Sequence, residues 1–200
     1  MSVIGDLLFW SGRSADLDDH LRHALQNAVP AEVDRLSASD FSSKSDDDIV
    51  DALVEKMKAE PIELKLDEAE PDVTEKNVEV RDVFGGTATV PGLRVAKVVP
   101  FDGEEGLFKL TPNQWDTNPP HGQVRGNKLT VGMEVRTSDD EQAIQYIDQT
   151  LSKVQVYIDR QKAQLDGYNA QLPAAIRSAV DRRRGTLGKA SSVAERLRGR

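Results

Sequence analysis

A few groups of residues in this chain have types and spacings that suit chemistry. Glu63 and Lys65 form the E-x-K pattern that carboxylate–lysine nucleases place on a strand to hold a metal ion. The aspartate that such a site needs on an earlier strand is missing, because the residues before Glu63 follow a helical pattern. His20 and His23 lie three residues apart on one predicted helix, and His121 is distant in the sequence. Zinc sites need at least three protein ligands, so the spacing favours surface histidines and predicts no metal ion or cofactor.

Two further patterns fail as ligand sites. The three aspartates at positions 46–48 lack the glycine and the distant glutamate of a calcium loop, so they are better explained by the positive end of a helix dipole. Residues 185–190, G-T-L-G-K-A, resemble part of a phosphate loop, but alanine replaces the hydroxyl that binds Mg²⁺ and the preceding residues are helical. The chain has no cysteine, which excludes thiol chemistry. The sequence therefore predicts a protein that is not an enzyme, with a metal-dependent nuclease as an alternative.

The charge of the chain is unevenly distributed. The total is −8, whereas residues 177–200 contain eight basic and two acidic residues and carry +6, which leaves −14 on the rest. The acidic body disfavours general nucleic-acid binding, but the basic end allows it locally. The residues that would contact phosphates are Arg177, Arg182, Arg183 and Arg184. A nucleic-acid-binding module is therefore the first alternative, ahead of the metal-dependent nuclease.

The element that must position everything else is a long helix over residues 138–172. Ser138 followed by Glu141 forms a capping box at its start. Its apolar residues then alternate at spacings of three and four over roughly 40 Å, which is the a/d seam of a coiled coil. The seam residues are Ile144, Ile147, Leu151, Val154, Ile158, Gln161, Leu165, Tyr168 and Leu172. The seam predicts packing either on the chain's own domain or on a second copy, and Gln161, the one polar member, could fix register and copy number.

The rest of the chain predicts an α+β fold. Two short N-terminal helices are expected, one capped by Ser14 and stopped by Pro30, the other starting at Ser45, with a further turn at 31–36 and a polar loop at 38–44. Period-two alternation predicts a mostly antiparallel sheet from residues 62–66, 78–84, 93–100, 107–110 and 129–135. Gly85-Gly86 predicts a turn, and Gly126-Asn127 predicts a tight hairpin because both residues tolerate positive φ.

These elements give a four-part organisation. We expect an N-terminal helical segment (1–60), a β-rich core (61–136), a long helix (138–184) that kinks or restarts between Gly167 and Pro173, and a weakly ordered basic linker (185–200). Residues 3–10 are apolar but short and without a basic leader, so neither a signal peptide nor a membrane span is expected, and the cytoplasm is the default location. These residues either dock on the core or await a partner.

An ordered set of motifs carries a resemblance to a known family. The motifs are Val90-Pro91-Gly92-Leu93-Arg94-Val95, Val99-Pro100-Phe101-Asp102-Gly103, Leu107-Phe108, Pro112, Asn118-Pro119-Pro120 with Gly122 and Val124, Tyr168-Asn169-Ala170-Gln171-Leu172-Pro173, and Arg182-Arg183-Arg184. Over residues 60–190 the chain resembles the N-terminal region of a family of bacterial, actinobacterial-type proteins. The resemblance implies a role in defence, ahead of a C-terminal effector domain that is often restriction-endonuclease-like (PD-(D/E)xK). The family's catalytic residues belong to that domain, so none is assigned here.

Taken together, these features predict a non-catalytic sensor, scaffold or oligomerisation module of a bacterial antiviral defence protein. Its expected partners are further copies of itself or another protein of a defence complex, with nucleic acid possible through the basic end and no membrane. The expected interface is the seam of the long helix.

Overall fold

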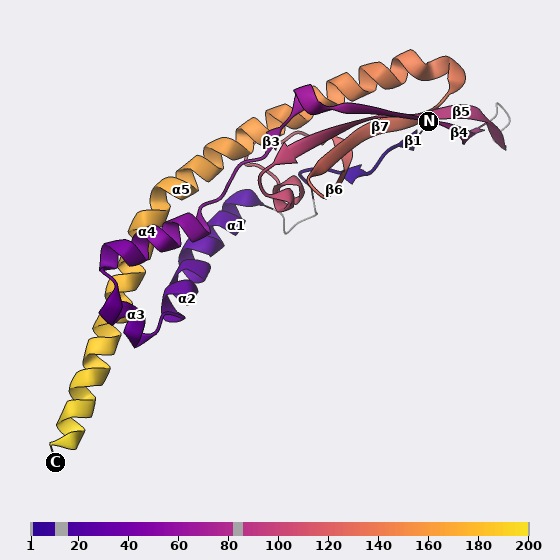
Figure 1. Ribbon diagram of the computed structural model, residues 1–200. Coiled ribbons are helices and arrows are strands. Elements are labelled where there is room, and N and C mark those ends of the chain that lie inside the picture. The colour runs from indigo at the N-terminus through magenta and orange to yellow at the C-terminus, as the bar shows by residue number, and fades with distance from the viewer. Residues whose placement is uncertain (1, 11–15, 82–85, 200) are drawn as a thin grey trace. The chain divides into compact units, whose positions relative to one another are not determined.

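The computed structural model describes residues 2–10, 16–81 and 86–199, so the predictions at Ser14, Phe84 and Gly85 lie outside the described residues. The chain forms two compact units (Figure 1). The sheet unit contains Met1–Leu17 and Glu60–Lys162, and the helical unit contains Asp18–Ala59 and Ala163–Arg200. The long helix α5 (Asp140–Arg198) contributes its first part to the sheet unit and its second part to the helical unit. The α+β class is confirmed.

The sheet unit is built on an antiparallel sheet. Its strands are β1 (Ser2–Val3), β2 (Asp6–Leu7), β3 (Glu63–Leu64), β4 (Glu70–Arg81), β5 (Thr87–Asp102), β6 (His121–Arg125) and β7 (Lys128–Arg136). The order of neighbouring strands along the sheet is β2-β6-β7-β5-β3. In addition, β4 pairs with β5 and β1 pairs with β7. Every pair between these strands is antiparallel, as the alternation predicted.

Strand β7 shows why this sheet needs small residues at its centre. Leu129, Val131 and Val135 are fully buried on one face, which explains the clean alternation in the sequence. Gly132 points to the other face, where an added Cβ would lie 2.4 Å from the carbonyl oxygen of Val95. The hairpin before β7 turns through Gly126 (φ 56°) and Asn127 (φ 59°), so the predicted tight turn is confirmed.

Several strand predictions are wrong in detail. Residues 107–110 are not a strand: a 3₁₀ helix, η3 (Glu105–Lys109), replaces it and buries Leu107 and Phe108. The predicted strand over 62–66 shortens to β3, because a second 3₁₀ turn, η2 (Leu66–Glu68), follows it. Short apolar runs satisfy a strand or a 3₁₀ turn equally well, so periodicity does not separate them. A third 3₁₀ turn, η4 (Thr137–Asp139), leads into α5.

The helical unit contains more helix than the sequence predicts. Its elements before α5 are α1 (Leu17–His23), the π-helical η1 (Ala24–Ala28), α2 (Val29–Asp34), α3 (Ala38–Ser43) and α4 (Asp46–Met57). Pro30 does not stop the first helix, because it lies in the first turn of α2, where its missing N–H group is not required. The polar loop predicted at 38–44 is wrong: Ser37 and Asp40 form a capping box that starts α3.

Helix α5 is longer than predicted. It neither restarts between Gly167 and Pro173 nor ends at Gly185, and the predicted linker over 185–200 is helical as far as Arg198. Pro173 is exposed, while Leu172 and Ile176 beside it are fully buried. Burying each of these side chains stabilises by about 1.5–3 kcal/mol, which offsets the ~3 kcal/mol that an internal proline costs. None of the described helices combines the length and apolar character needed to cross a membrane.

Candidate interaction site

The predicted seam residues form the core of the chain. Eight of the nine are buried, from Ile147 to Leu172, and only Ile144 is exposed, at 47%. The members up to Gln161 lie in the sheet unit, and Leu165, Tyr168 and Leu172 lie in the helical unit. Eight seam residues therefore pack on the chain's own elements, which leaves Ile144 as the exposed member of the predicted interface, and self-association of the chain stays a prediction.

Gln161 has an intramolecular role. Its side-chain Nε2 donates hydrogen bonds to the carbonyl oxygens of Leu107 (2.9 Å) and Leu110 (2.7 Å). These carbonyls lie at the C-terminal end of the 3₁₀ helix η3. Leu107 O also accepts from the Leu110 amide (3.1 Å), so the Gln161 amide gives Leu107 O a second donor and supplies the donor to the half-buried Leu110 O. This explains a polar residue in the seam without any function in setting copy number.

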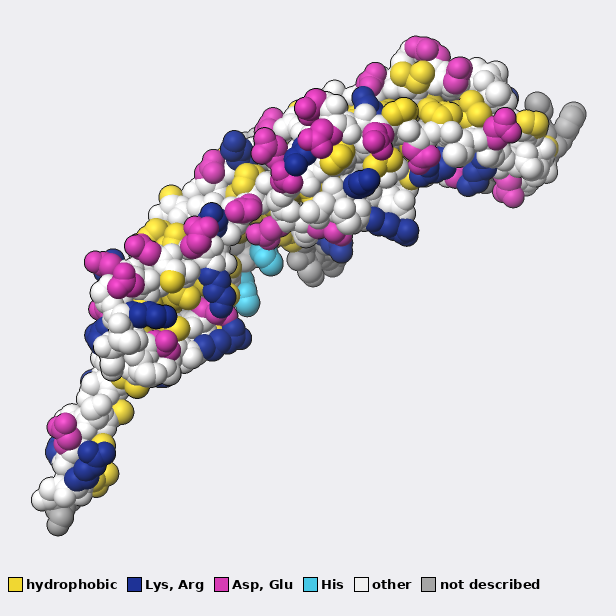
Figure 2. Space-filling view, in the orientation of Figure 1, with side chains coloured by type: hydrophobic (Ala, Val, Ile, Leu, Met, Phe, Trp, Pro, Cys, Tyr) yellow, Lys and Arg dark blue, Asp and Glu magenta, His cyan; other side chains and the backbone are white. Residues whose placement is uncertain are grey.

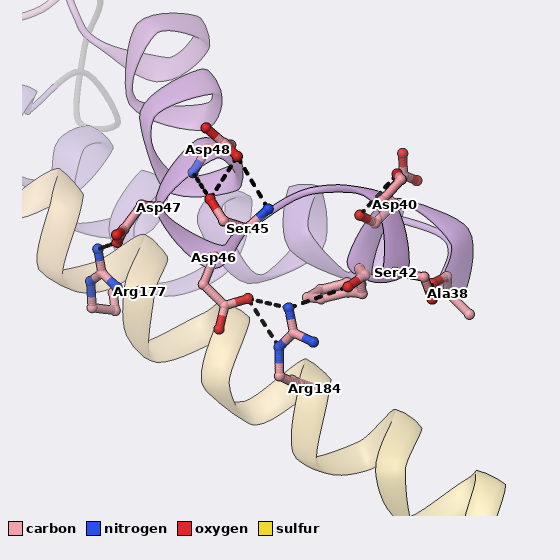
Figure 3. Close-up of polar contacts among 11 residues, drawn as sticks. Ala38, Asp40, Ser42, Ser45, Asp46, Asp47, Asp48, Arg177 and Arg184 are labelled. Carbon is pink, nitrogen blue, oxygen red and sulfur yellow. Dashed lines mark hydrogen bonds and ion pairs between the residues drawn. The ribbon is translucent and has the colours of Figure 1, made fainter.

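Two of the four predicted phosphate-contacting arginines pair with aspartates of α4. Arg177 forms an ion pair with Asp47, which raises the pKa of the guanidinium. Arg184 Nε donates to Asp46 Oδ1 at 2.9 Å, and its guanidinium carbon lies 5.3 Å from the ring centroid of Phe41. Figure 3 shows both arginines of α5 directed at the acidic first turn of α4.

The other two arginines differ from each other. Arg182 is exposed, whereas Arg183 is half-buried and its Nε has no hydrogen-bond partner in the part of the chain that the structure describes. The four side chains do not form one free basic surface, because half of them hold α5 against its neighbours.

Of the two candidate nuclease residues, Lys65 forms an ion pair. Lys65 Nζ lies 2.9 Å from Asp102 Oδ2, and this hydrogen bond raises the pKa of Lys65. Glu63 is exposed and lies opposite Asp102 in the β3–β5 register. His20 and His23 are exposed on α1. Within residues 2–10, 16–81 and 86–199 no group of three or more His, Asp or Glu side chains is arranged to hold a metal ion.

The exposed feature that stands out is a pair of tryptophans in the sheet unit. Trp10 and Trp115 are the two tryptophans of the chain, and they are 40% and 50% exposed. Their ring centroids lie 5.5 Å apart at 60°. In the N-terminal apolar stretch Leu8 and Phe9 are buried, as docking on the core predicts, while Leu7 and Trp10 are exposed.

Phe9 fixes the position of Trp10. Phe9 is fully buried and has φ 56°, a left-handed conformation that costs a non-glycine residue about 1–2 kcal/mol. Its ring packs on Tyr157 (5.0 Å) and Phe108 (5.5 Å). Its carbonyl oxygen accepts a hydrogen bond of 2.8 Å from Thr111 Oγ1. This anchor turns the chain at the surface and directs the next side chain, Trp10, outward.

Three contacts with α5 fix the segment that carries Trp115. Arg160 Nη1 donates to the carbonyl oxygen of Gln114 at 3.0 Å, and the amide of Asp116 donates to Tyr157 Oη at 3.1 Å. Lys153 Nζ lies 3.1 Å from Asp116 Oδ1. Partial burial raises the pKa of Asp116, but the hydrogen bonds from Asn118 and Lys153 outweigh it, so the pKa is lowered overall. Trp115 is therefore held in place between restrained neighbours.

A pocket of about 440 Å³ adjoins Trp10. It lies between β2, η3 and β6, and its apolar lining includes Leu7, Phe108 and Val124. The charged residues that line it are Asp6, Glu105, Lys109 and Arg125, two of each sign. We call Leu7, Trp10, Trp115 and this pocket the tryptophan site. Such an arrangement suits the binding of a large apolar side chain.

Comparison with protein-family models, with curated proteins and with solved structures finds no match to this chain. The site therefore has to be interpreted from its own geometry. Sequence reasoning overlooked Trp115 because a single tryptophan in an irregular segment carries no periodic signal. Only the fold brings residues 10 and 115 together.

Proposed function

We propose that this chain is a non-catalytic scaffold and sensor module of a bacterial antiviral defence protein, and that it recognises a segment of a partner protein through the tryptophan site. The association with defence rests on the family resemblance of residues 60–190. The observation that carries the binding role is the exposed Trp10–Trp115 pair, which buried neighbours hold in place.

The physical argument is the free energy that burying these exposed tryptophan side chains against a partner would contribute to binding. Tryptophans bury 150–250 Å² each when covered and dominate the hot spots of protein interfaces. Here Phe9, which is fully buried and has φ 56°, holds the backbone beside Trp10, and Trp10 is 40% exposed. A pre-positioned aromatic pair loses little conformational entropy on binding, which favours affinity.

The charges around the pocket select among partners. Two acidic and two basic residues balance each other, which suits a peptide segment with a large apolar side chain better than a polyanion. The predicted nucleic-acid surface is also reduced, because Arg177 and Arg184 are engaged with α4. A partner protein is favoured over a second copy, since the seam expected to join copies is buried inside the chain.

The test uses the two tryptophans as reporters. A library of random dodecapeptides is selected on the wild-type chain and counter-selected on the Trp10→Ala/Trp115→Ala variant. We expect aromatic or branched aliphatic peptides that shift the tryptophan emission of the wild type on titration. Trp115→Ala alone should weaken them at least tenfold, and Val156→Ala, which removes another exposed apolar side chain (45%), should leave binding unchanged.

Peptides that bind both tryptophan variants as well as the wild type, or a selection that yields none, would refute the proposed site. Binding of a single-stranded oligonucleotide that quenches tryptophan fluorescence and weakens steeply with salt would instead support the nucleic-acid alternative.

A further inference from the structure

The apolar stripe of α5 continues beyond the part of the helix that the other helices cover. From residue 176 onward the a and d positions of the heptad pattern follow one another at alternating spacings of four and three, so they lie on one face of the helix. The residues at these positions are Ile176, Val180, Arg183, Leu187, Ala190, Ala194 and Leu197. Ile176 and Val180 are fully buried, whereas Leu197 is 68% exposed and Val193, beside this stripe, is 53% exposed.

The covered turns show how this face of α5 binds a helix. Helix α4 buries Ile49, Val50 and Leu53, and its acidic first turn forms ion pairs with α5 through Asp46 and Asp47 (Figure 3).

The other end of α4 is also attached to α5. Tyr168 Oη donates to the carbonyl oxygen of Met57 at 3.0 Å, and the Asn169 side chain exchanges two hydrogen bonds of 2.9 Å with the backbone of Ala59. The partner of this stripe inside the chain is therefore an amphipathic helix with an acidic N-terminal turn.

The last turns of α5, residues 186–198, repeat the features that α4 recognises. They combine the half-buried Leu187 and the exposed Val193 and Leu197 with Lys189, Arg196 and Arg198, against the single acidic Glu195.

No hydrogen bond or ion pair joins these turns to another element among the described residues. Figure 1 shows this end of α5 extending past α3, and the face drawn in Figure 2 shows hydrophobic and basic side chains together there.

We propose that residues 186–198 of α5 bind an acidic amphipathic helix of a partner protein in the manner in which α4 binds the preceding turns. A second copy fits poorly, because two basic faces would repel each other. Nucleic acid fits poorly, because Val193 and Leu197 would stay exposed in a phosphate contact. The proposal uses none of the tryptophan-site residues, so it stands or falls separately from the proposed function.

The test is a fluorescence anisotropy titration of the full chain. The probe is a labelled helical peptide of about three heptads with Leu at a and d and Glu at e and g, and the control peptide carries Lys at e and g. We expect the acidic peptide to bind at least tenfold more tightly than the basic one. Leu187→Asp/Leu197→Asp should weaken it at least tenfold, while Lys162→Glu, on an exposed position of covered α5, should not.

A charge swap gives the sharpest result. Lys189→Glu/Arg196→Glu/Arg198→Glu should lose the acidic peptide and gain the basic one, which a nonspecific apolar contact does not predict. Circular dichroism should show an unchanged fold, because these residues lie outside the buried core. Absence of acidic-peptide binding, equal binding of both peptides, tighter binding of an oligothymidine, or a mass that doubles through these residues would overturn the proposal.

Discussion

The substitution Gln161→Leu separates an internal seam from an oligomeric one. In a coiled coil between copies, replacing a polar seam residue with leucine raises stability and relaxes copy number. In this structure it removes hydrogen bonds to the carbonyls of Leu107 and Leu110. Each such bond contributes about 1 kcal/mol net, and a buried acceptor left without a donor costs about 1–3 kcal/mol.

Two terms offset part of that loss. Leu107 O keeps the bond that it accepts from the Leu110 amide at 3.1 Å, and the substitution also removes Gln161 Oε1, which is buried without a partner among the described residues. We therefore expect Gln161→Leu to lower the free energy of unfolding of the sheet unit by about 1–3 kcal/mol.

Urea denaturation followed by tryptophan emission measures this, because both tryptophans lie in the sheet unit. The matched control is Gln155→Leu, at a half-buried position on the same helix where the amide donates to Asp159 one turn away. This variant should stay within about 0.5 kcal/mol of the wild type. A Gln161→Leu variant that is more stable than the wild type and heavier in solution would refute the internal role of this residue.

Three further outcomes follow from the fold. Pro173→Ala should stabilise the helical unit by about 1–2 kcal/mol in thermal denaturation. The alanine N–H can donate to the carbonyl oxygen of Asn169 within the helix, and the position is exposed. Gly132→Ala should lower the free energy of unfolding by at least about 3 kcal/mol or prevent folding, because the added Cβ would lie 2.4 Å from the Val95 carbonyl oxygen. Insoluble protein or a much lower urea midpoint would show this effect. Hydrogen bonds from Ser45 lower the pKa of the Asp48 carboxyl. The ionised carboxylate therefore stabilises α4 when the pH is above the ordinary aspartate pKa of about 3.9, and this stabilisation is lost as the pH falls from there through the lowered pKa. Helical circular dichroism from pH 6 to pH 3 should therefore show a steeper loss of stability for the wild type than for Ser45→Ala.

Patterns that repeat within a few residues were predictable from the sequence. The a/d spacing in α5, the alternation in β7 and the turn at Gly126-Asn127 are each set by local geometry, and the structure confirms all three elements. The same spacing could not say what covers the seam. A heptad pattern needs an apolar neighbour but does not specify whether that neighbour belongs to the same chain.

The elements that were wrong depend on contacts distant in the sequence. Pro173 is tolerated because Leu172 and Ile176 are buried, and η3 forms where Gln161, far along the chain, supplies donors to the carbonyls at its end. The tryptophan site arises the same way, since Phe9 is anchored by Tyr157 and Phe108. Intrinsic propensity and periodicity contain no information on such pairings.

The central claim is that this chain itself covers the seam of α5 from Ile147 to Val180, still contacts α5 at Arg184, and leaves residues 188–198 largely exposed. Hydrogen–deuterium exchange along α5, at two protein concentrations, tests this most directly. We expect slow exchange from Ala143 to Val180, fast exchange over residues 186–198, and no change with concentration. Uniform protection as far as Arg198, or protection of residues 144–172 that increases with concentration, would contradict it.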